Sequence, residues 1–180
     1  LSVSGTIVDS DFTYISNVEA LSSYSGAVAL TLGSAADASG LATVTGNGDD
    51  SITIGAGFDN ALRVAIGGGN DVVNASGSAA VLTIAATANV DQNDTLIGGT
   101  TAGDVISLTA GVSAVFGGNV TKFETLSVAY AAGANTTSVT VHDNMTAAGA
   151  TLTVSASAEN NSADVFNFNG TAELDGLFNI

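Results

Sequence analysis

The fold is decided by residues 45–74, which read TGNGDDSITIGAGFDNALRVAIGGGNDVVN. Three nine-residue segments fill most of this stretch, at 45–53, 54–62 and 66–74, and each runs from glycines through an aspartate towards aliphatic residues. Glycine and aspartate favour tight turns, whereas aliphatic residues that alternate with polar ones favour a half-buried strand. The stretch therefore predicts short strands joined by tight turns, with residues 63–65 as an insertion between the second and third segments.

The same strand pattern recurs along the whole chain. It is a triplet in which a small or polar residue separates two large apolar ones. Its copies lie at residues 30–32, 52–54, 64–66, 82–84, 106–108, 139–141, 152–154 and 166–168. Strands this short are not stable in isolation, but stacked rungs bury their apolar faces in one continuous core. Because no sustained helical period accompanies them, we predict an all-β fold, a right-handed parallel β-helix or β-roll-like solenoid.

Internal repetition supports a solenoid and suggests its division. Residues 18–22 and 123–127 match at an offset of 105, and three further pairs follow in the same order. The further pairs are 30–32 with 139–141, 40–44 with 149–154, and 50–54 with 164–168. We therefore expect a first solenoid unit at 1–105, which includes the turns of 45–74, and a second, imperfect unit at 106–180. Both belong to one continuous solenoid, which we expect to be a fragment of a longer chain.

Charge restricts the partners of the chain. Arg63 and Lys122 are its two basic residues against 17 acidic ones, and the formal net charge is −15. Two cations cannot replace the counterions of nucleic acid, and they give anionic membranes nothing to attract. No apolar run approaches the roughly 20 residues that span a bilayer. We therefore expect no nucleic acid partner and no membrane insertion, and bound cations that relieve the self-repulsion.

The glycine-aspartate turns match the chemistry that Ca²⁺ requires. The three segments fit the calcium-binding nonapeptide G-G-x-G-x-D-x-U-x, except at its first position and at an alanine in the aliphatic place of the second segment. Calcium takes six to eight oxygen ligands from carboxylates and backbone carbonyls, and glycine lets a turn aim its carbonyls inward. The predicted metal residues are Gly46, Gly48, Asp50, Asp59, Gly67, Gly69, Asp71, Asp94 and Asp104.

Aspartate spacing predicts how these turns are arranged. Asp50 and Asp71 are 21 residues apart, and Asp71 and Asp94 are 23 residues apart, so the three would stack on one flank. The turn of Gly46–Asp50 would then pair with that of Gly67–Asp71. Asp59 would lie on the opposite flank. For Asp59, Asp94 and Asp104, ligation and simple turn formation explain the sequence equally well. Glu19 and Glu124 are interpreted as structural residues that satisfy rung ends or pair with a local backbone amide.

These turns resemble the repeats-in-toxin family of calcium-binding β-roll proteins, which bacteria export by type I secretion. The block Ile15–Ser22, of the form (I/V)-x-N-V-E-x-L-S, looks like those of surface-layer and adhesin members. The resemblance implies an extracellular protein at the bacterial cell surface that needs calcium to fold or assemble, and that self-assembles into sheets or fibres. The insertion at 63–65 departs from the tandem register, which favours an irregular β-helix with a few calcium turns.

Three functions are compatible with this sequence. The first is a structural, calcium-binding repeat of a surface layer, fibre or biofilm matrix. The second is an adhesin or binding module, for which a cell-surface polysaccharide is a candidate ligand. The third is a noncatalytic calcium roll of a secreted hydrolase. We expect no enzymatic activity in the chain itself, because His142 beside Asp143 lacks a nucleophile that would complete a triad, and we interpret it as a surface residue.

Overall fold

Short parallel strands run through the computed structural model, which describes residues 1–87, 90–157 and 162–180, with side chains except at positions 24 and 25. The strands are β1 (Ser2–Ile7), β2 (Ala20–Leu32), β3 (Thr43–Thr45), β4 (Ser51–Ile54), β5 (Leu62–Ile66), β6 (Val72–Asn74), β7 (Leu82–Ala86), β8 (Thr95–Ile97), β9 (Val105–Thr109), β10 (Ser113–Val115), β11 (Val120–Thr121), β12 (Thr125–Ala129), β13 (Thr136–Thr140), β14 (Thr151–Ser155), β15 (Val165–Asn169) and β16 (Leu177–Asn179). One short helix, α1 (Ser34–Ala38), and two 3-10 turns, η1 (Asp9–Phe12) and η2 (Asp143–Met145), accompany them.

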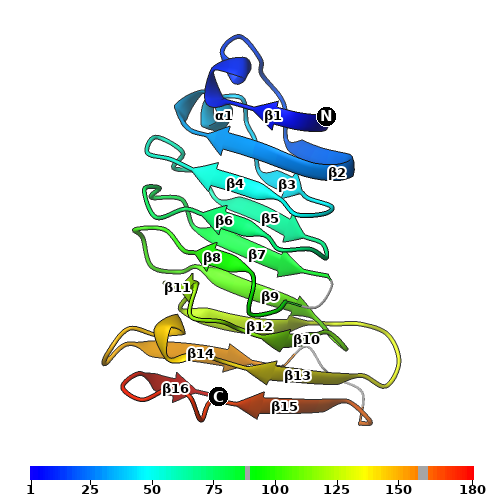
Figure 1. Ribbon diagram of the computed structural model, residues 1–180, viewed down its shortest axis with the longest axis vertical. Helices are drawn as coiled ribbons and strands as arrows, with labels where there is room; N and C mark the ends of the chain where they lie inside the picture. The colour runs from blue at the N-terminus through cyan, green and yellow to red at the C-terminus, as the bar shows by residue number, and fades with distance from the viewer. Residues whose placement is uncertain (88–89, 158–161) are drawn as a thin grey trace.

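These strands form a β-solenoid of about eight turns, so the predicted all-β solenoid fold is confirmed. The long strand β2 joins two arms of one sheet. The first arm has the order β2-β4-β6-β8-β11, and the second has β2-β3-β5-β7-β9-β12-β14-β16. All their pairings are parallel, so the chain passes from one arm to the other and back in each rung. Figure 1 shows the rungs stacked along the long axis from the N-terminus to the C-terminus.

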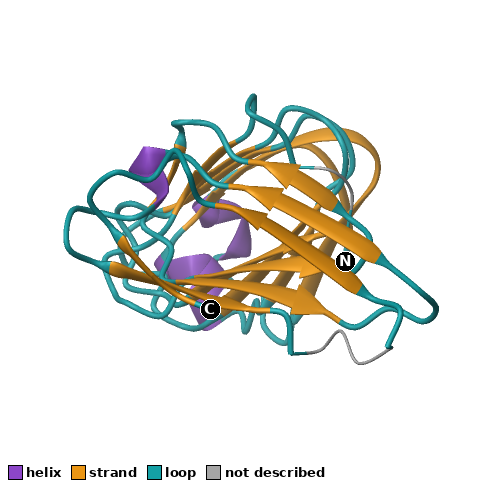
Figure 2. Ribbon diagram, turned by 90° about the horizontal axis from the view of Figure 1, so that it is seen from below, coloured by secondary structure: helices purple, strands orange, loops and turns teal. Residues whose placement is uncertain are grey.

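The core lies between the arms, as the view along the axis in Figure 2 shows. In β4, Ile52 and Ile54 are buried while Thr53 between them is exposed, and Leu82 and Ile84 of β7 are buried likewise. Register carries each apolar column through the stack, because Val44 pairs with Val64 and Val64 with Ile84. The alternation predicted for the triplets is therefore confirmed except at 64–66, where Ala65 is buried between Val64 and Ile66. Stacked aliphatic residues hold neighbouring rungs together.

The rungs are longer than two nonapeptides. Val44, Val64 and Ile84 lie in register at intervals of 20 residues. Residues 63–65, which looked like an insertion between nonapeptides, lie inside strand β5, where Val64 is buried. The boundary expected between residues 105 and 106 falls inside β9, which pairs with β7 on one side and β12 on the other.

The stacking changes in the second half of the molecule. The first arm ends at β11, which η2 contacts, and a separate parallel sheet of order β10-β13-β15 begins in the same rung, between β9 and β11. The matched segments of the internal repeat keep corresponding places only in part. Residues 40–44 and 149–154 contribute to β3 and β14 of the second arm, whereas 50–54 lie in β4 of the first arm and 164–168 in β15 of the separate sheet.

The two ends of the solenoid differ in how they are covered. At the N-terminal end, Asp9 in η1 accepts the backbone N–H groups of Gly33 (2.8 Å) and Ala36 (2.8 Å), which fixes η1 against α1. At the C-terminal end, β15 and β16 leave Phe166, Phe168 and Phe178 half-buried. The ring centroids of Phe166 and Phe168 are 6.3 Å apart, and those of Phe168 and Phe178 are 5.1 Å apart. The core is therefore closed at the first rung and partly open at the last.

Candidate functional site

Three predicted aspartates form a column along one flank. Asp50, Asp71 and Asp94 stand directly before β4, β6 and β8, and they are 1%, 1% and 2% exposed. These strands are neighbours in the first arm, so the three carboxylates occupy the same corner of consecutive rungs. The predicted stacking is thus confirmed, and we call these residues the aspartate column.

Backbone hydrogen bonds link the column. Asp50 Oδ1 accepts the N–H of Val28 (2.9 Å), Asp71 Oδ1 accepts that of Asp50 (3.0 Å), and Asp94 Oδ1 accepts that of Asp71 (2.8 Å). Asp94 Oδ2 accepts the N–H of Asp91 (2.9 Å). Asp71 and Asp94 each satisfy the backbone N–H directly before the strand of the preceding rung, and Asp50 satisfies one inside β2. These donors would otherwise be buried without a partner.

Burial makes the charge of the column unfavourable. The pKa of Asp71 is raised to about 6, chiefly by desolvation and then by the charges of neighbouring aspartates, against the lowering effect of the Asp50 N–H. Desolvation also raises the pKa of Asp50 and of Asp94, against the lowering effect of their backbone hydrogen bonds. Three like charges in a partly dehydrated stack favour either protonation or a bound cation.

One oxygen of the column, Asp50 Oδ2, is fully buried and has no hydrogen bond within the described residues. The Asn47 N–H lies near this carboxylate and lowers its pKa without meeting hydrogen-bond geometry to Oδ2. This oxygen lies against Gly46, where a Cβ would overlap it. Glycine is therefore required at position 46 by the close approach of the carboxylate.

Consecutive turns of the column stack directly on each other, as predicted. Gly69 adopts φ +136°, and a Cβ there would lie 2.6 Å from Asp49 Oδ1 of the rung before. Gly48 adopts φ +110°, and a Cβ at Gly67 would lie 3.5 Å from the carbonyl oxygen of Gly46. Outside the column, exposed Asp49 accepts the N–H of Asn70 (2.9 Å). The four predicted glycines thus form two stacked turns.

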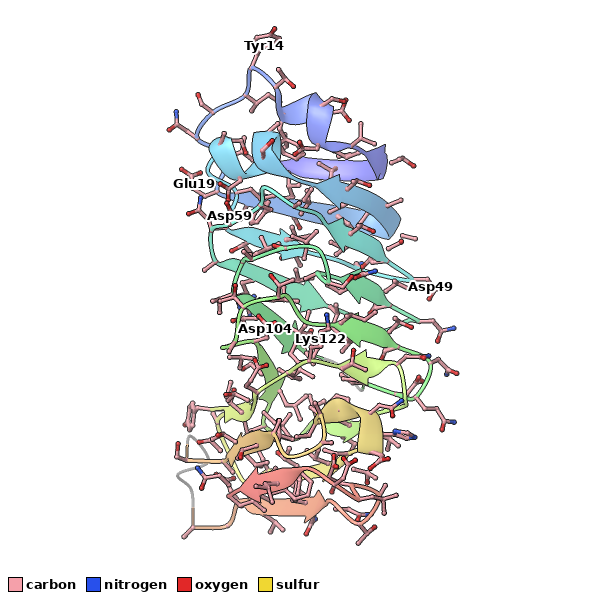
Figure 3. The ribbon with its side chains drawn as sticks, turned by 90° about the vertical axis from the view of Figure 1, so that its left-hand side faces the viewer. Tyr14, Glu19, Asp49, Asp59, Asp104 and Lys122 are labelled. Atoms are coloured by element: carbon pink, nitrogen blue, oxygen red, sulfur yellow. The ribbon has the colours of Figure 1, made fainter. Side chains whose placement is uncertain are left out.

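The remaining predicted aspartates lie on the other flank. Figure 3 shows Asp49 at one edge of the molecule and Asp59 at the opposite edge. Asp59 is exposed, and its N–H donates to Asp37 Oδ1 (3.2 Å). Asp104 is buried beside β9, where it accepts the N–H groups of Leu82 (2.7 Å) and Gly99 (2.5 Å). The nine predicted residues are therefore divided between two corners.

Glu124 extends the second corner, which confirms its structural interpretation. Its Oε2 accepts the N–H groups of Gly103 (2.9 Å) and Asp104 (2.9 Å). Desolvation raises the pKa of Asp104, its bonds to Leu82 and Gly99 lower it, Glu124 raises it, and the nearby charge of Lys122 lowers it. An acidic residue directly before a strand thus accepts the backbone N–H of the preceding rung on both flanks.

This rule of one carboxylate before a strand was not recognised from the sequence. It also covers Asp164, directly before β15, whose Oδ1 accepts the N–H of Asn135 directly before β13 (2.9 Å). The signal was present, because acidic residues precede β4, β6, β8, β9, β12 and β15, but only the pairing of strands shows which amide each one receives.

A further acidic group lies near the C-terminal end. Asp143, Glu173 and Asp175 place one carboxylate oxygen each within 4.8 Å of one another. Glu173 Oε1 accepts the N–H of Gly176 (2.7 Å), and Asp143 Oδ1 accepts that of Leu174 (2.8 Å). Residues 143 and 173–175 are thirty residues apart in sequence, so no local motif could have predicted this group.

The histidine beside Asp143 also has a local role. His142 Nδ1 accepts the N–H of Asn144 (3.2 Å) at the start of η2, and its side chain is half-buried. Both side chains of the pair that suggested a dyad are therefore bonded to backbone amides.

Comparison with known proteins found no matching family model, no matching curated protein and no matching solved structure. In the described part of the chain, no helix has the length and apolar character needed to cross a bilayer. The candidate site is therefore interpreted from its own geometry.

Proposed function

We propose that this chain is a structural, calcium-dependent module of an extracellular surface layer, fibre or biofilm matrix, similar in its turns to repeats-in-toxin proteins. The aspartate column carries the proposal. It places three carboxylates with raised pKa values on one corner of a chain whose net charge is −15. A divalent cation at that corner would offset the electrostatic cost of keeping them ionised.

Oxygen ligands are available around the first turn of the column. Asp50 Oδ2 is buried and has no hydrogen-bond partner within the described residues. The backbone carbonyls of residues 46–49 belong to the same loop, and calcium accepts such mixed sets of carboxylate and carbonyl oxygens. Water would complete the shell, because this turn lies at the surface while Asp50 itself is buried.

Calcium binding would then make folding depend on the compartment in which the chain lies. In a cytoplasm poor in calcium the charged column disfavours the folded state, whereas millimolar calcium outside the cell stabilises it by binding the folded chain alone. This coupling supports a chain that folds after export to the bacterial cell surface.

A structural role is supported by the solenoid itself. Its second arm is a long ladder of parallel strands that ends on β16, where Leu177 is exposed and Phe178 is half-buried. Open strand edges and apolar rungs are surfaces on which neighbouring copies pair, so we expect growth into sheets or fibres.

The test is far-UV circular dichroism of the full chain during a calcium titration, with magnesium as control. We expect a cooperative gain of β signal with calcium alone, followed by assemblies visible by electron microscopy. Asp71→Ala should raise the calcium midpoint more than Asp49→Ala, because Asp71 is buried in the column and Asp49 is exposed. A β signal and an unfolding midpoint that are the same in chelator and in calcium, or equal effects of the two substitutions, would contradict the calcium assignment.

A further inference from the structure

A groove opens where the first arm of the sheet stops. Strand β11 pairs with β8 on one side, and on its other side the next rung contributes η2 instead of a strand. The groove has a volume of about 640 Å³ and is lined by residues 99–102, 121–124, 144–147 and 150–151. This volume is within the range of small-molecule sites in proteins, which is roughly 300–1,000 Å³.

The lining combines a small apolar surface with scattered hydroxyl groups. Phe123 and Met145 are buried beneath it, and the exposed Ala102 and Ala147 leave space above them. Five threonines contribute methyl and hydroxyl groups: Thr100, Thr101, Thr121, Thr146 and Thr151. Such a surface can contact both the C–H and the O–H groups of a ligand.

Lys122 is the cation of the groove and the one lysine of the chain. It is exposed, and among the described residues no ion pair holds its ammonium, although its charge lowers the pKa of Asp104. Its backbone lies in the left-handed region at φ +64°, where its carbonyl oxygen packs against Gly98. A non-glycine residue in that conformation is unfavourable, and such residues concentrate at binding sites. Figure 3 shows Lys122 close to Asp104.

Charges around the groove decide which ligand it fits. Glu124 lines it with Lys122, and Oε2 of Glu124 is bonded to the N–H groups of Gly103 and Asp104. An anionic ligand would meet these acids and the −15 charge of the chain, whereas a cationic ligand would meet the ammonium. A neutral hydroxyl group both accepts from the ammonium and donates to the carboxylate.

We propose that this groove binds a neutral saccharide, with sugar hydroxyls between Lys122 and Glu124 and the C–H face of the ring against Ala102 and Ala147. Asn144 at the rim offers an amide beside them, with its Nδ2 donating to the carbonyl of Gly118 (2.9 Å). This inference is independent of calcium at the aspartate column, because no column residue lines the groove.

The test is titration of the full, isotopically labelled chain with neutral tetrasaccharides of glucose, mannose, galactose and N-acetylglucosamine, and with a tetra-uronate as the charged control. Amide signals of residues 99–102, 121–124 and 144–151 should shift saturably with at least one neutral probe and less with the uronate. Lys122→Met should weaken that binding at least tenfold, whereas the matched Arg63→Met, an exposed cation on β5, should leave it unchanged.

Ala102→Trp provides a second variant, since this exposed alanine can be enlarged without entering the core. We expect it to keep the circular dichroism spectrum and abolish the signal shifts. The proposal is overturned if no neutral probe binds at millimolar concentration, if only the uronate binds, or if Lys122→Met and Ala102→Trp both bind as the unmodified chain does.

Discussion

Replacing the middle carboxylate of the aspartate column by its neutral amide should stabilise the chain when calcium is absent. Asp71→Asn keeps an oxygen that can accept the N–H of Asp50 and removes the buried charge. The pKa of Asp71 is raised from 3.8 to about 6. At 1.36 kcal/mol for each pKa unit, ionised Asp71 costs about 3 kcal/mol of folding free energy at pH 7.

The amide is a weaker acceptor than a carboxylate, and this offsets about 1 kcal/mol of the gain. We therefore expect Asp71→Asn to raise the free energy of unfolding by about 2 kcal/mol at pH 7 in chelator. Asp71→Ala removes the acceptor as well, and an unsatisfied Asp50 N–H costs about 1–3 kcal/mol. The alanine variant should thus be close to the unmodified chain or less stable.

The pH dependence of the free energy of unfolding is a second test of the buried charge of Asp71. Because the folded pKa of Asp71 lies above its unfolded value, the contribution of this residue to stability is fully present below about pH 4 and is lost as the pH rises through about 6. Asp71→Asn should remove this part of the pH dependence. Urea unfolding followed by circular dichroism, at pH 4 and pH 7 in chelator, measures both effects.

Asp49→Asn is the matched control, since it makes the same charge change at the exposed neighbour of Asp50. Its effect should be smaller and nearly independent of pH. With calcium at 100 times its dissociation constant the unmodified chain should gain about 2.7 kcal/mol, and Asp71→Asn should gain less. If Asp71→Asn is no more stable than the unmodified chain at pH 7 in chelator, the argument from the buried charge is wrong.

Three further pairs of substitutions test the stack. Gly46→Ala should destabilise the fold by several kcal/mol because its Cβ would overlap a buried carboxylate, whereas Gly68→Ala, with nothing within 4 Å of the added atom, should change the melting temperature little. Glu124→Gln should preserve the bonds to two amides of the preceding rung, and Glu124→Ala should cost about 1–3 kcal/mol by urea unfolding. Leu96→Ala, in the buried core, should cost about 2–5 kcal/mol, and Leu177→Ala, at the exposed last strand, should cost far less by the same measurement.

Much of the fold could be predicted because its signals are local. The period-two triplets correctly placed Ile52 and Ile54 inside and Thr53 outside. The similar spacings of Asp50, Asp71 and Asp94, 21 and 23 residues, correctly predicted their stacking, since a rung of nearly constant length returns the chain to the same corner.

Other features depend on partners distant in sequence, and these could not be predicted. That Asp71 would bind the N–H of Asp50 requires the register of β6 on β4, which pattern alone does not give. The separate sheet of β10, β13 and β15, and the place of η2 beside β11, depend on pairings between distant segments that the sequence pattern does not give. The length of a rung was misjudged at 63–65, because a glycine-poor strand looked like an insertion between turns.

The hydrogen bonds of the aspartate column give the solenoid a chemical direction. Every link runs from an amide of one rung to a carboxylate of the rung that follows it in the chain. Loss of the first rung would leave a carboxylate oxygen for water to solvate, whereas loss of the rung that carries Asp94 would strip the Asp71 amide of its acceptor. Truncation from the C-terminus should therefore cost more hydrogen bonding than truncation from the N-terminus. The amide of each rung in the column gains its acceptor only when the next rung has packed on it.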